Sequence, residues 1–288
     1  MIKERRNKEG IKVGIIGIMI NLSLAITKVV LSLITNSVSI MADALNNITD
    51  TTSSLLTIIG FKIGNKKPTK LHPYGYARYE YISSFLISIF MVIMSSIFVF
   101  ESLTKIIKPE RLNINNTTYL ILFITLIIKI IQYLYYVKMY KKLNSVSIKA
   151  TSVETRNDII TNLSILISMI IMKNFNINID GYIGLVVSML LVISSFKVFL
   201  ESNSLLIGVV PNDEIIDLIK SKIMSYEQVQ GIHELFIHNY GMNNNYITVH
   251  LEVNKNMKLK NINKLCNKIE NDFKKENYNI VIHIDPKL

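Results

Sequence analysis

The chain has 288 residues, half of them hydrophobic, and it carries a formal net charge of +11. The tail from Pro211 contains ten basic and ten acidic residues, so the whole excess of positive charge lies in the first 210 residues. There it flanks long apolar runs, which argues against a basic nucleic-acid-binding domain and favours loops near anionic lipid. With a single cysteine, Cys266, no intrachain disulfide can form.

Six segments of the first 210 residues are long enough for a membrane-spanning helix, which needs about 20 mostly apolar residues. On hydropathy alone the second and fifth could be buried soluble helices, but the four clearer spans around them favour membrane helices that face the interior of the bundle. The basic N-terminus, MIKERRNKEG, is typical of a signal peptide. However, the apolar run after it is too long for a signal core, and no cleavage site of small residues follows, so it is interpreted as the first span. We expect an α-helical membrane domain over 1–210, with spans at 13–35, 37–61, 82–104, 117–138, 148–172 and 181–202.

Lysine and arginine are distributed unevenly between the two sides of these spans. If the N-terminus is cytosolic, the inner stretches hold fourteen of them and the outer loops hold four. Because basic residues accumulate in cytoplasmic loops, both termini are predicted to be cytosolic. The chain is therefore expected to be an integral protein of the cell membrane, with the lipid bilayer as its surroundings.

Two of the six segments carry ionisable residues. The second contains Asp43, Asn46 and Asp50, and the fifth contains Glu154 and Asp158. A charged group at the centre of a span costs roughly 2.5–3.5 kcal/mol on insertion scales, so its presence indicates a function. Asn46 and Asp50 are four residues apart and share one helix face, as do Glu154 and Asp158. If the two faces meet, they place three carboxylates and one amide oxygen around one point.

This all-oxygen set predicts which ions the site prefers. It suits Mn²⁺, Mg²⁺ or Ca²⁺ better than Zn²⁺, which prefers histidine and cysteine. None of the five histidines lies in a predicted span. Two other interpretations remain, namely interhelical hydrogen bonds between polar side chains and a proton relay without metal. The matched spacing of acids on two helices favours metal binding over both.

The tail, 211–288, is predicted to be a separate cytosolic domain. Apolar residues recur with helical spacing in two of its segments, and three others show the short or alternating apolar pattern of strands. The order αββαβ indicates an α+β domain of ferredoxin-like type, with one sheet and its helices on one face. The expected elements are helix 213–226, strands 233–238 and 246–253, helix 259–273 and strand 280–284.

Three segments, ADALNNITD (42–50), HPYGYARYE (72–80) and VETRND (153–158), resemble the cation diffusion facilitator family of divalent metal exporters. Six spans followed by an αββαβ tail are also the layout of that family, so the resemblance covers nearly the whole chain. It implies a homodimeric secondary active transporter, not an enzyme, that exchanges a divalent metal ion for protons. The transport site that the resemblance implies consists of Asn46, Asp50, Glu154 and Asp158.

The second span also resembles one branch of the family. Its Asn-x-x-x-Asp pattern is similar to the manganese exporters, whereas zinc transporters carry His or Asp at the position of Asn46 and His at that of Glu154. Manganese exporters usually carry Asp in place of Glu154, a change that keeps the carboxylate and adds a methylene. The expected substrate is Mn²⁺, with Zn²⁺ or Fe²⁺ at relaxed selectivity as alternatives, and no prosthetic group is expected.

The resemblance implies a further metal site in the tail, which it also makes the dimerisation domain. The residues that match regulatory metal ligands of some members are His233, His250, His283 and Asp285. His283 and Asp285 lie two residues apart on a predicted strand and therefore share one face. His72 lies in the loop between the second and third spans, where some members bind another metal, but a structural role of this loop is favoured.

Two functions outside transport compete with this interpretation. A membrane metal sensor would signal through the tail and would not need the carboxylates of the spans. An intramembrane enzyme would need a nucleophile with a base, or a metal with an open position, and the predicted spans contain no histidine or cysteine to build one. Metal flux that depends on the span carboxylates distinguishes transport from sensing.

Overall fold

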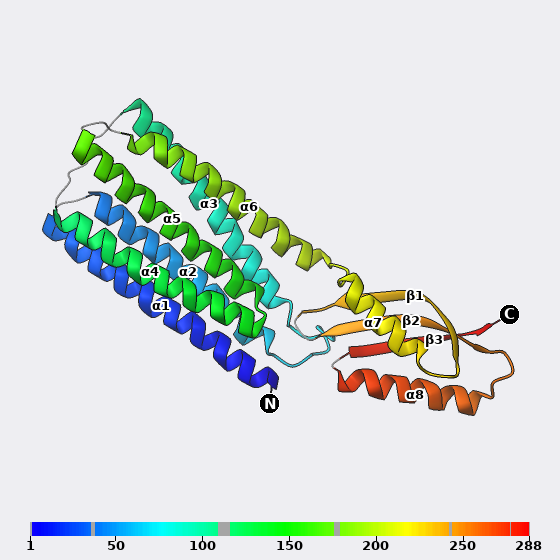
Figure 1. The fold of residues 1–288 in the computed structure, drawn as a ribbon. Helices are drawn as coiled ribbons and strands as arrows, with labels where there is room; N and C mark the ends of the chain where they lie inside the picture. The colour runs from blue at the N-terminus through cyan, green and yellow to red at the C-terminus, as the bar shows by residue number, and fades with distance from the viewer. Residues whose placement is uncertain are drawn as a thin grey trace. The chain divides into compact units, whose positions relative to one another are not determined.

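The computed structural model describes residues 2–35, 38–108, 116–175, 179–241, 244–276 and 278–287. Six long helices are followed by a smaller set of helices and strands (Figure 1). The chain divides into two compact units. The helical unit comprises Met1–Asn65 and Tyr79–Asn203, and the C-terminal unit comprises Lys66–Arg78 and Ser204–Leu288.

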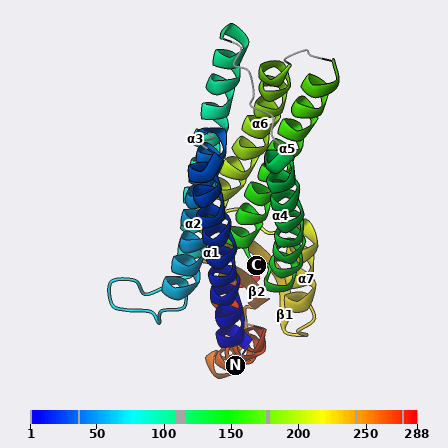
Figure 2. The same ribbon diagram turned by 90° about the vertical axis from the view of Figure 1, so that its left-hand side faces the viewer.

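Six helices make up almost all of the helical unit and run side by side (Figures 1 and 2). Each coincides with one of the six predicted spans, and most extend several residues beyond it. Hydropathy marks only the apolar stretch, whereas a helix continues wherever its polar ends can reach water. The helices are α1 (Ile2–Thr35), α2 (Val38–Gly64), α3 (Tyr79–Ile107), α4 (Asn116–Leu143), α5 (Val146–Phe175) and α6 (Asp180–Ile207).

Four of these helices, α1, α3, α4 and α6, contain a stretch long and apolar enough to cross a membrane. Among the described residues α2 and α5 do not, because the polar residues already noted in the sequence lower their hydropathy. Both lie within the bundle, since α2 packs against α1, α3 and α5, and α5 packs against α2, α3 and α4. A helical domain with four apolar spans is thus confirmed, and membrane crossing by α2 and α5 stays a prediction.

Small residues allow close contact between the helices of this unit. A Cβ atom added at Gly14 of α1 would lie 2.4 Å from the side chain of Ile58 on α2. One added at Gly17 would lie 2.2 Å from the hydroxyl of Tyr136 on α4. In helical bundles of membranes, small residues at interfaces permit such approach, so α1 is held tightly against α2 and α4.

A buried ion pair joins three helices of the same unit. Arg6 on α1 donates through Nη2 to both carboxylate oxygens of Glu80 on α3, at 3.0 and 2.8 Å. Its Nε donates to the backbone carbonyl of Leu143, at the end of α4, at 2.8 Å. The side chains of Arg6 and Glu80 keep only 14 % and 5 % exposure, so neither charge can be satisfied by water.

Glu80→Gln is expected to destabilise the helical unit, because Arg6 would keep its charge without a carboxylate. Removing one partner of a buried pair costs about 3–5 kcal/mol. Thermal unfolding of the purified protein in detergent should therefore shift clearly to lower temperature. The control is Glu4→Gln, which removes an exposed pair with Lys8 and should change stability little. Equal shifts in the two variants would contradict the importance of the buried pair.

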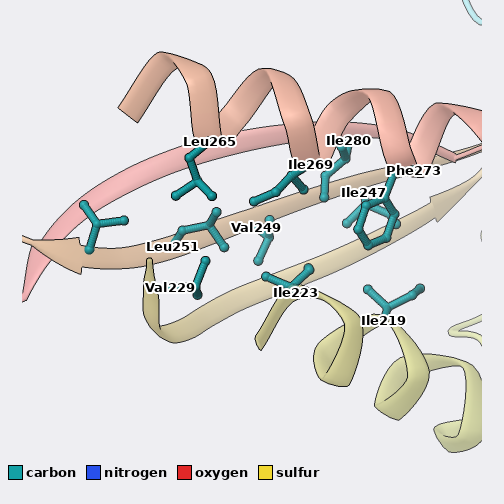
Figure 3. Close-up of a cluster of buried hydrophobic side chains, with 11 residues drawn as sticks. Ile219, Ile223, Val229, Ile247, Val249, Leu251, Leu265, Ile269, Phe273 and Ile280 are labelled. Carbon is teal, nitrogen blue, oxygen red and sulfur yellow. The ribbon is translucent and has the colours of Figure 1, made fainter. Parts of the chain in front are cut away.

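The C-terminal unit has the predicted αββαβ order, which confirms a small α+β domain. Strand β2 is central, antiparallel to β1 and parallel to β3. Both helices pack on one face of this sheet over a single apolar core, in which Ile223, Ile247 and Ile269 are fully buried (Figure 3). The elements are α7 (Asp213–Met224), β1 (Val229–Asn239), β2 (Asn245–Asn254), α8 (Leu259–Lys275) and β3 (Tyr278–Lys287).

The segment 66–78, which connects α2 to α3, belongs to the C-terminal unit. Arg78 donates through Nε and Nη2 to the backbone carbonyl of Asn239, at 3.2 and 2.8 Å. Its guanidinium also lies 4.6 Å from the ring centre of Tyr240. Tyr74 stacks on the same ring, with centroids 4.2 Å apart. The segment is therefore anchored to the residues at the end of β1.

Candidate metal sites

A pocket among α2, α3, α5 and α6 contains the carboxylates predicted from the sequence. About 390 Å³ of its space is unfilled by atoms, counting space open to solvent, and Asp50, Glu154 and Asp158 all line it. Apolar side chains such as Met91 and Leu191 complete much of the wall. The four-residue spacing on α5 turns Glu154 and Asp158 to the same side, where they meet Asp50 of α2. The structure thus brings three of the predicted transport-site residues to one place.

Lys129 of α4 contacts two of these carboxylates. Its Nζ lies 2.7 Å from Oδ2 of Asp50 and 2.8 Å from Oδ2 of Asp158. It also donates to Oδ1 of Asn21 on α1, at 3.3 Å. The lysine side chain is only 2 % exposed. Lys129 was not predicted from the sequence, although a lone lysine within the apolar run LIIKII signals a functional residue in a membrane helix.

Glu154 is hydrogen-bonded to a serine, and the side-chain oxygen of the nearby Asn157 lacks a hydrogen bond. Ser53 of α2 donates its hydroxyl to Oε1 of Glu154 at 2.6 Å. Asn157 lines the same pocket, and its buried Oδ1 has no hydrogen-bond partner among the described residues. Burying an unpaired polar oxygen is costly, and a metal ion is a partner that would satisfy it. Asn157 was not predicted as a ligand, although its position next to Asp158 in the sequence could have indicated one.

The ligand atoms of the three carboxylates do not form a compact group in the described structure. Within the described part of the helical unit, no three carboxylate or imidazole ligand atoms lie within 4.8 Å of one another. Lys129 offers a physical reason, because its ammonium group lies against both Asp50 and Asp158. The side chains of Asp43 and Asn46 lie outside the part of the chain whose side chains are described, so their contribution stays a prediction.

A second pocket adjoins the first and extends toward one end of the bundle. About 510 Å³ of its space is unfilled by atoms, counting space open to solvent, and it shares Phe98, Thr161 and Leu191 with the first pocket. Its lining continues to Lys105, near the last residue of α3, and to Gly184, near the first residue of α6. Together the linings of the two pockets extend from the carboxylates toward the end of the bundle where α3 ends and α6 begins.

The predicted ligands of the C-terminal unit lie on the sheet face without helices. Alternate residues of a strand point to opposite faces. Val249 belongs to the buried core, and His250 therefore points the other way. In the register of the sheet, His250 is paired with His233 on β1 and with His283 on β3. Three histidines far apart in the sequence thus form a row across the sheet.

Asp285 connects these histidines. Its Oδ2 lies 3.0 Å from Nε2 of His233 and 2.8 Å from Nδ1 of His250, and its Oδ1 lies 3.3 Å from Nδ1 of His283. Ligand atoms of His233, His250 and Asp285 all lie within 4.8 Å of one another. The hydrogen bond with His250 holds the pKa of Asp285 below its usual range, so the carboxylate is charged at neutral pH. Imidazoles with a carboxylate suit a transition metal such as Zn²⁺.

His72 is not surrounded by a comparable set of ligands. Its backbone N–H donates to the hydroxyl of Thr69 at 3.1 Å, and its ring packs edge-on against Tyr76 with centroids 4.8 Å apart. In the described ranges it belongs to no group of three metal ligands. These contacts support the structural role that was favoured for its loop.

Two family profiles match most of the chain. Residues 14–207 match the family profile described as a cation efflux transmembrane domain, and residues 211–287 match the cation efflux protein cytoplasmic domain. The chain is 25 % identical over 246 residues to an uncharacterised transporter of Methanocaldococcus jannaschii, covering 85 % of this chain and 87 % of that one. It is 25 % identical over 285 residues to the manganese efflux system protein MneP of Bacillus subtilis, covering 96 % and 95 %. It is 22 % identical over 242 residues to a cadmium, cobalt and zinc/H(+)-K(+) antiporter of Bacillus velezensis, covering 83 % and 77 %.

Proposed function

The chain belongs to the cation efflux family, the cation diffusion facilitators, and we propose that it exports Mn²⁺ from the cytosol in exchange for protons. The observation that carries this proposal is the pocket lined by Asp50, Glu154 and Asp158. With the unpaired oxygen of Asn157, it offers a set of hard oxygen ligands. Such ligands suit Mn²⁺ better than Zn²⁺.

Two relatives bear on the identity of the metal. The similarity to MneP, which covers nearly all of both chains, supports Mn²⁺ as the substrate. The similarity to the cadmium, cobalt and zinc antiporter supports the alternative, an exporter of Zn²⁺ or Fe²⁺ with relaxed selectivity. No histidine or cysteine lines the described pocket, and this absence favours manganese over the alternative.

The proposed topology makes the pathway lead outward. With both termini in the cytosol and six spans in the cell membrane, α3 ends and α6 begins on the outer side. The linings of the two adjoining pockets extend from Asp50, Glu154 and Asp158 toward that end of the bundle. This direction of the pocket linings supports release of an exported ion on the outer side.

Exchange with protons follows from the ligands themselves. A carboxylate binds a metal ion only in its deprotonated form, so metal and protons compete for the same oxygens. After the ion has left, protons that move inward down their gradient would bind the vacated carboxylate oxygens. The coupling therefore requires no separate proton relay elsewhere in the helical unit.

The function is tested by uptake into proteoliposomes that contain the purified protein. Mn²⁺ uptake should exceed uptake of Zn²⁺, Fe²⁺ and Cd²⁺ at equal concentrations, and these ions should compete weakly. Faster uptake of Zn²⁺ or Fe²⁺ would favour the alternative within the family. No uptake of any ion, in a protein whose tail still binds metal, would favour a membrane metal sensor and overturn the proposal.

The C-terminal unit is proposed to form the homodimer and to bind a regulatory metal ion through His233, His250, His283 and Asp285. Asp285→Asn should weaken this binding by at least about 10–100-fold, the loss seen when even a group that orients a metal ligand is removed. Counting the Zn²⁺ ions bound per full-length chain by equilibrium dialysis measures the effect. His238→Ala, which changes an exposed histidine outside the cluster, is the control. Equal stoichiometry in all three proteins would refute the site.

A further inference from the structure

We propose that the ammonium group of Lys129 is a tethered cation of the transport site, which holds Asp50 and Asp158 while no metal is bound and releases them when metal arrives. This inference rests on the proposed function, because it assigns a step of the same transport cycle to a residue of α4. It accounts for the contacts that Lys129 makes with two of the pocket carboxylates. Neither sequence spacing nor the predicted ligand set includes this lysine.

The contacts of Lys129 are those of a cation that shares two carboxylates. Its Nζ lies 2.7 and 2.8 Å from one oxygen each of Asp50 and Asp158. The three side chains are 2 %, 7 % and 13 % exposed, respectively, so water contributes little to their solvation. A buried ammonium needs anionic partners, and a divalent metal ion needs the same oxygens. The lysine and the metal therefore compete for Asp50 and Asp158.

The lysine and the metal approach these carboxylates from different sides. The described lining of the pocket comes from α2, α3, α5 and α6, with no contribution from α4. Lys129 reaches Asp50 and Asp158 from α4, next to Asn21 of α1. An ion held in the pocket can therefore contact Asp50 and Asp158 from the side away from the lysine. Transfer of the carboxylates from ammonium to metal then needs only a rotation of side chains.

Neutral amide oxygens near Lys129 can accept hydrogen bonds from its ammonium group once a metal ion binds the carboxylates. Asn21 Oδ1 already lies 3.3 Å from Nζ of Lys129. Gln132 lies three residues further along α4, on the same helix face, and its Nε2 donates to Asn21 and to Tyr136. The buried Oε1 of Gln132 has no hydrogen-bond partner among the described residues. Because the lysine stem is flexible, its ammonium can move from the carboxylates toward these two amide oxygens.

This arrangement gives Lys129 a definite role in the transport cycle. When the metal leaves on the outer side, the ammonium returns to Asp50 and Asp158 and compensates their charge. The metal-free site, with the exchanged protons on its remaining carboxylate oxygens, can then reorient with its charge compensated. Net transport requires the site to reorient without metal, whereas exchange of metal for metal across the membrane does not. Loss of the lysine charge should therefore impair net transport far more than exchange.

Lys129→Met is the variant that tests the proposal, with Lys129→Arg as the charge-retaining control. Binding of Mn²⁺ alone is measured by titration calorimetry on full-length protein in an Asp285→Asn background, which removes the tail cluster. Alkaline pH prevents protons from taking the place of the lysine. The Kd of Lys129→Met should fall by about tenfold or more if the lysine occupies the carboxylates most of the time. The Kd of Lys129→Arg should stay closer to that of the parent protein.

Transport in proteoliposomes supplies the second readout. In Lys129→Met, net Mn²⁺ uptake should fall by about tenfold or more, since the empty site that must return is no longer compensated. Exchange of internal for external Mn²⁺ should persist. An unchanged Kd together with unchanged net uptake would overturn the proposal. Equal losses of exchange and net uptake at an unchanged Kd would also overturn it, because they indicate a structural role alone.

If Lys129→Met does not fold, a second variant with the opposite expected effect on Mn²⁺ affinity tests the proposal. Gln132→Met removes the vacant acceptor, so the ammonium should remain longer on the carboxylates and Mn²⁺ should bind more weakly. Equal or tighter binding in Gln132→Met would contradict the proposal. Failure of the proposed function is recognised separately: the parent protein would then move no Mn²⁺, whereas the binding measurements would still report on competition by Lys129.

Discussion

Asp50→Asn is expected to abolish Mn²⁺ transport while the protein still folds. The substitution preserves the shape of the side chain but removes the charge of a buried pocket residue that is 5 % exposed. Loss of a group that only orients a metal ligand already costs about 10–100-fold in affinity or activity. Loss of a charged ligand should therefore reduce uptake by more than about 100-fold. Uptake of Mn²⁺ into proteoliposomes measures the effect, and metal-induced proton release should disappear with it.

Variants of α5 provide the comparison for this result. Asp158→Asn should behave like Asp50→Asn, because Asp158 lines the same pocket. Glu154→Asp should keep activity, because its carboxylate survives and only a methylene is lost. If Asp50→Asn still releases as many protons as the parent protein when Mn²⁺ is added, the competition mechanism is wrong. The protons would then reside elsewhere, with Asp43 as the first residue to examine.

Asn46→His is expected to change the selectivity of transport. The substitution exchanges a hard amide oxygen for an imidazole nitrogen, which suits Zn²⁺ much better than it suits Mn²⁺. The ratio of Zn²⁺ to Mn²⁺ uptake should rise by about tenfold or more, which corresponds to about 1.4 kcal/mol of differential binding. Uptake of the two ions from a mixture, measured in the same proteoliposomes, gives this ratio directly.

The matched control for this variant is Asn46→Gln. It has nearly the size of histidine but keeps the amide oxygen, so the Zn²⁺ to Mn²⁺ ratio should stay low. A rise in both variants would mean that side-chain size, and not ligand chemistry, sets selectivity. An unchanged ratio in Asn46→His would show that Asn46 does not contact the transported ion.

The helices and the tail domain were largely predictable, because the buried faces of helices and strands require apolar residues at regular spacing in the sequence. Long apolar runs marked α1, α3, α4 and α6, whereas the runs of α2 and α5 are interrupted by polar residues. The start of α1 at Ile2 and the charged residues after it lie outside any apolar window. Strand β1 runs from Val229 to Asn239, longer than the predicted 233–238. A register shift between His233 and Phe236, where Glu234 has a φ of 47°, interrupts the alternation on which strand prediction depends.

The transport pocket was predictable only in part. Acidic residues in apolar segments are costly and therefore conspicuous, so Asp50, Glu154 and Asp158 could be chosen from spacing alone. Lys129 could not be assigned to them, because its contacts depend on how α4 packs against α2 and α5. The same holds for Asn157, whose unpaired oxygen is visible only once its neighbours are placed. Sequence spacing reports one helix face at a time and says nothing about which faces meet.

The histidines of the tail illustrate the same limit on a sheet. His233, His250 and His283 lie on three different strands and become neighbours only through the pairing of β1 with β2 and of β2 with β3. Their spacing along the chain does not reveal this register. Family resemblance supplied the set, and the sheet shows why it comes together at Asp285.

The central claim is that this chain moves Mn²⁺ through the pocket of Asp50 and Asp158 in exchange for protons. It is tested most directly by recording Mn²⁺ uptake and internal pH together in proteoliposomes with an acidic interior. The account predicts that Mn²⁺ enters while the interior becomes more alkaline, and that collapsing the pH gradient stops accumulation. Mn²⁺ accumulation that continues unchanged without a pH gradient, and without any proton movement, would contradict it.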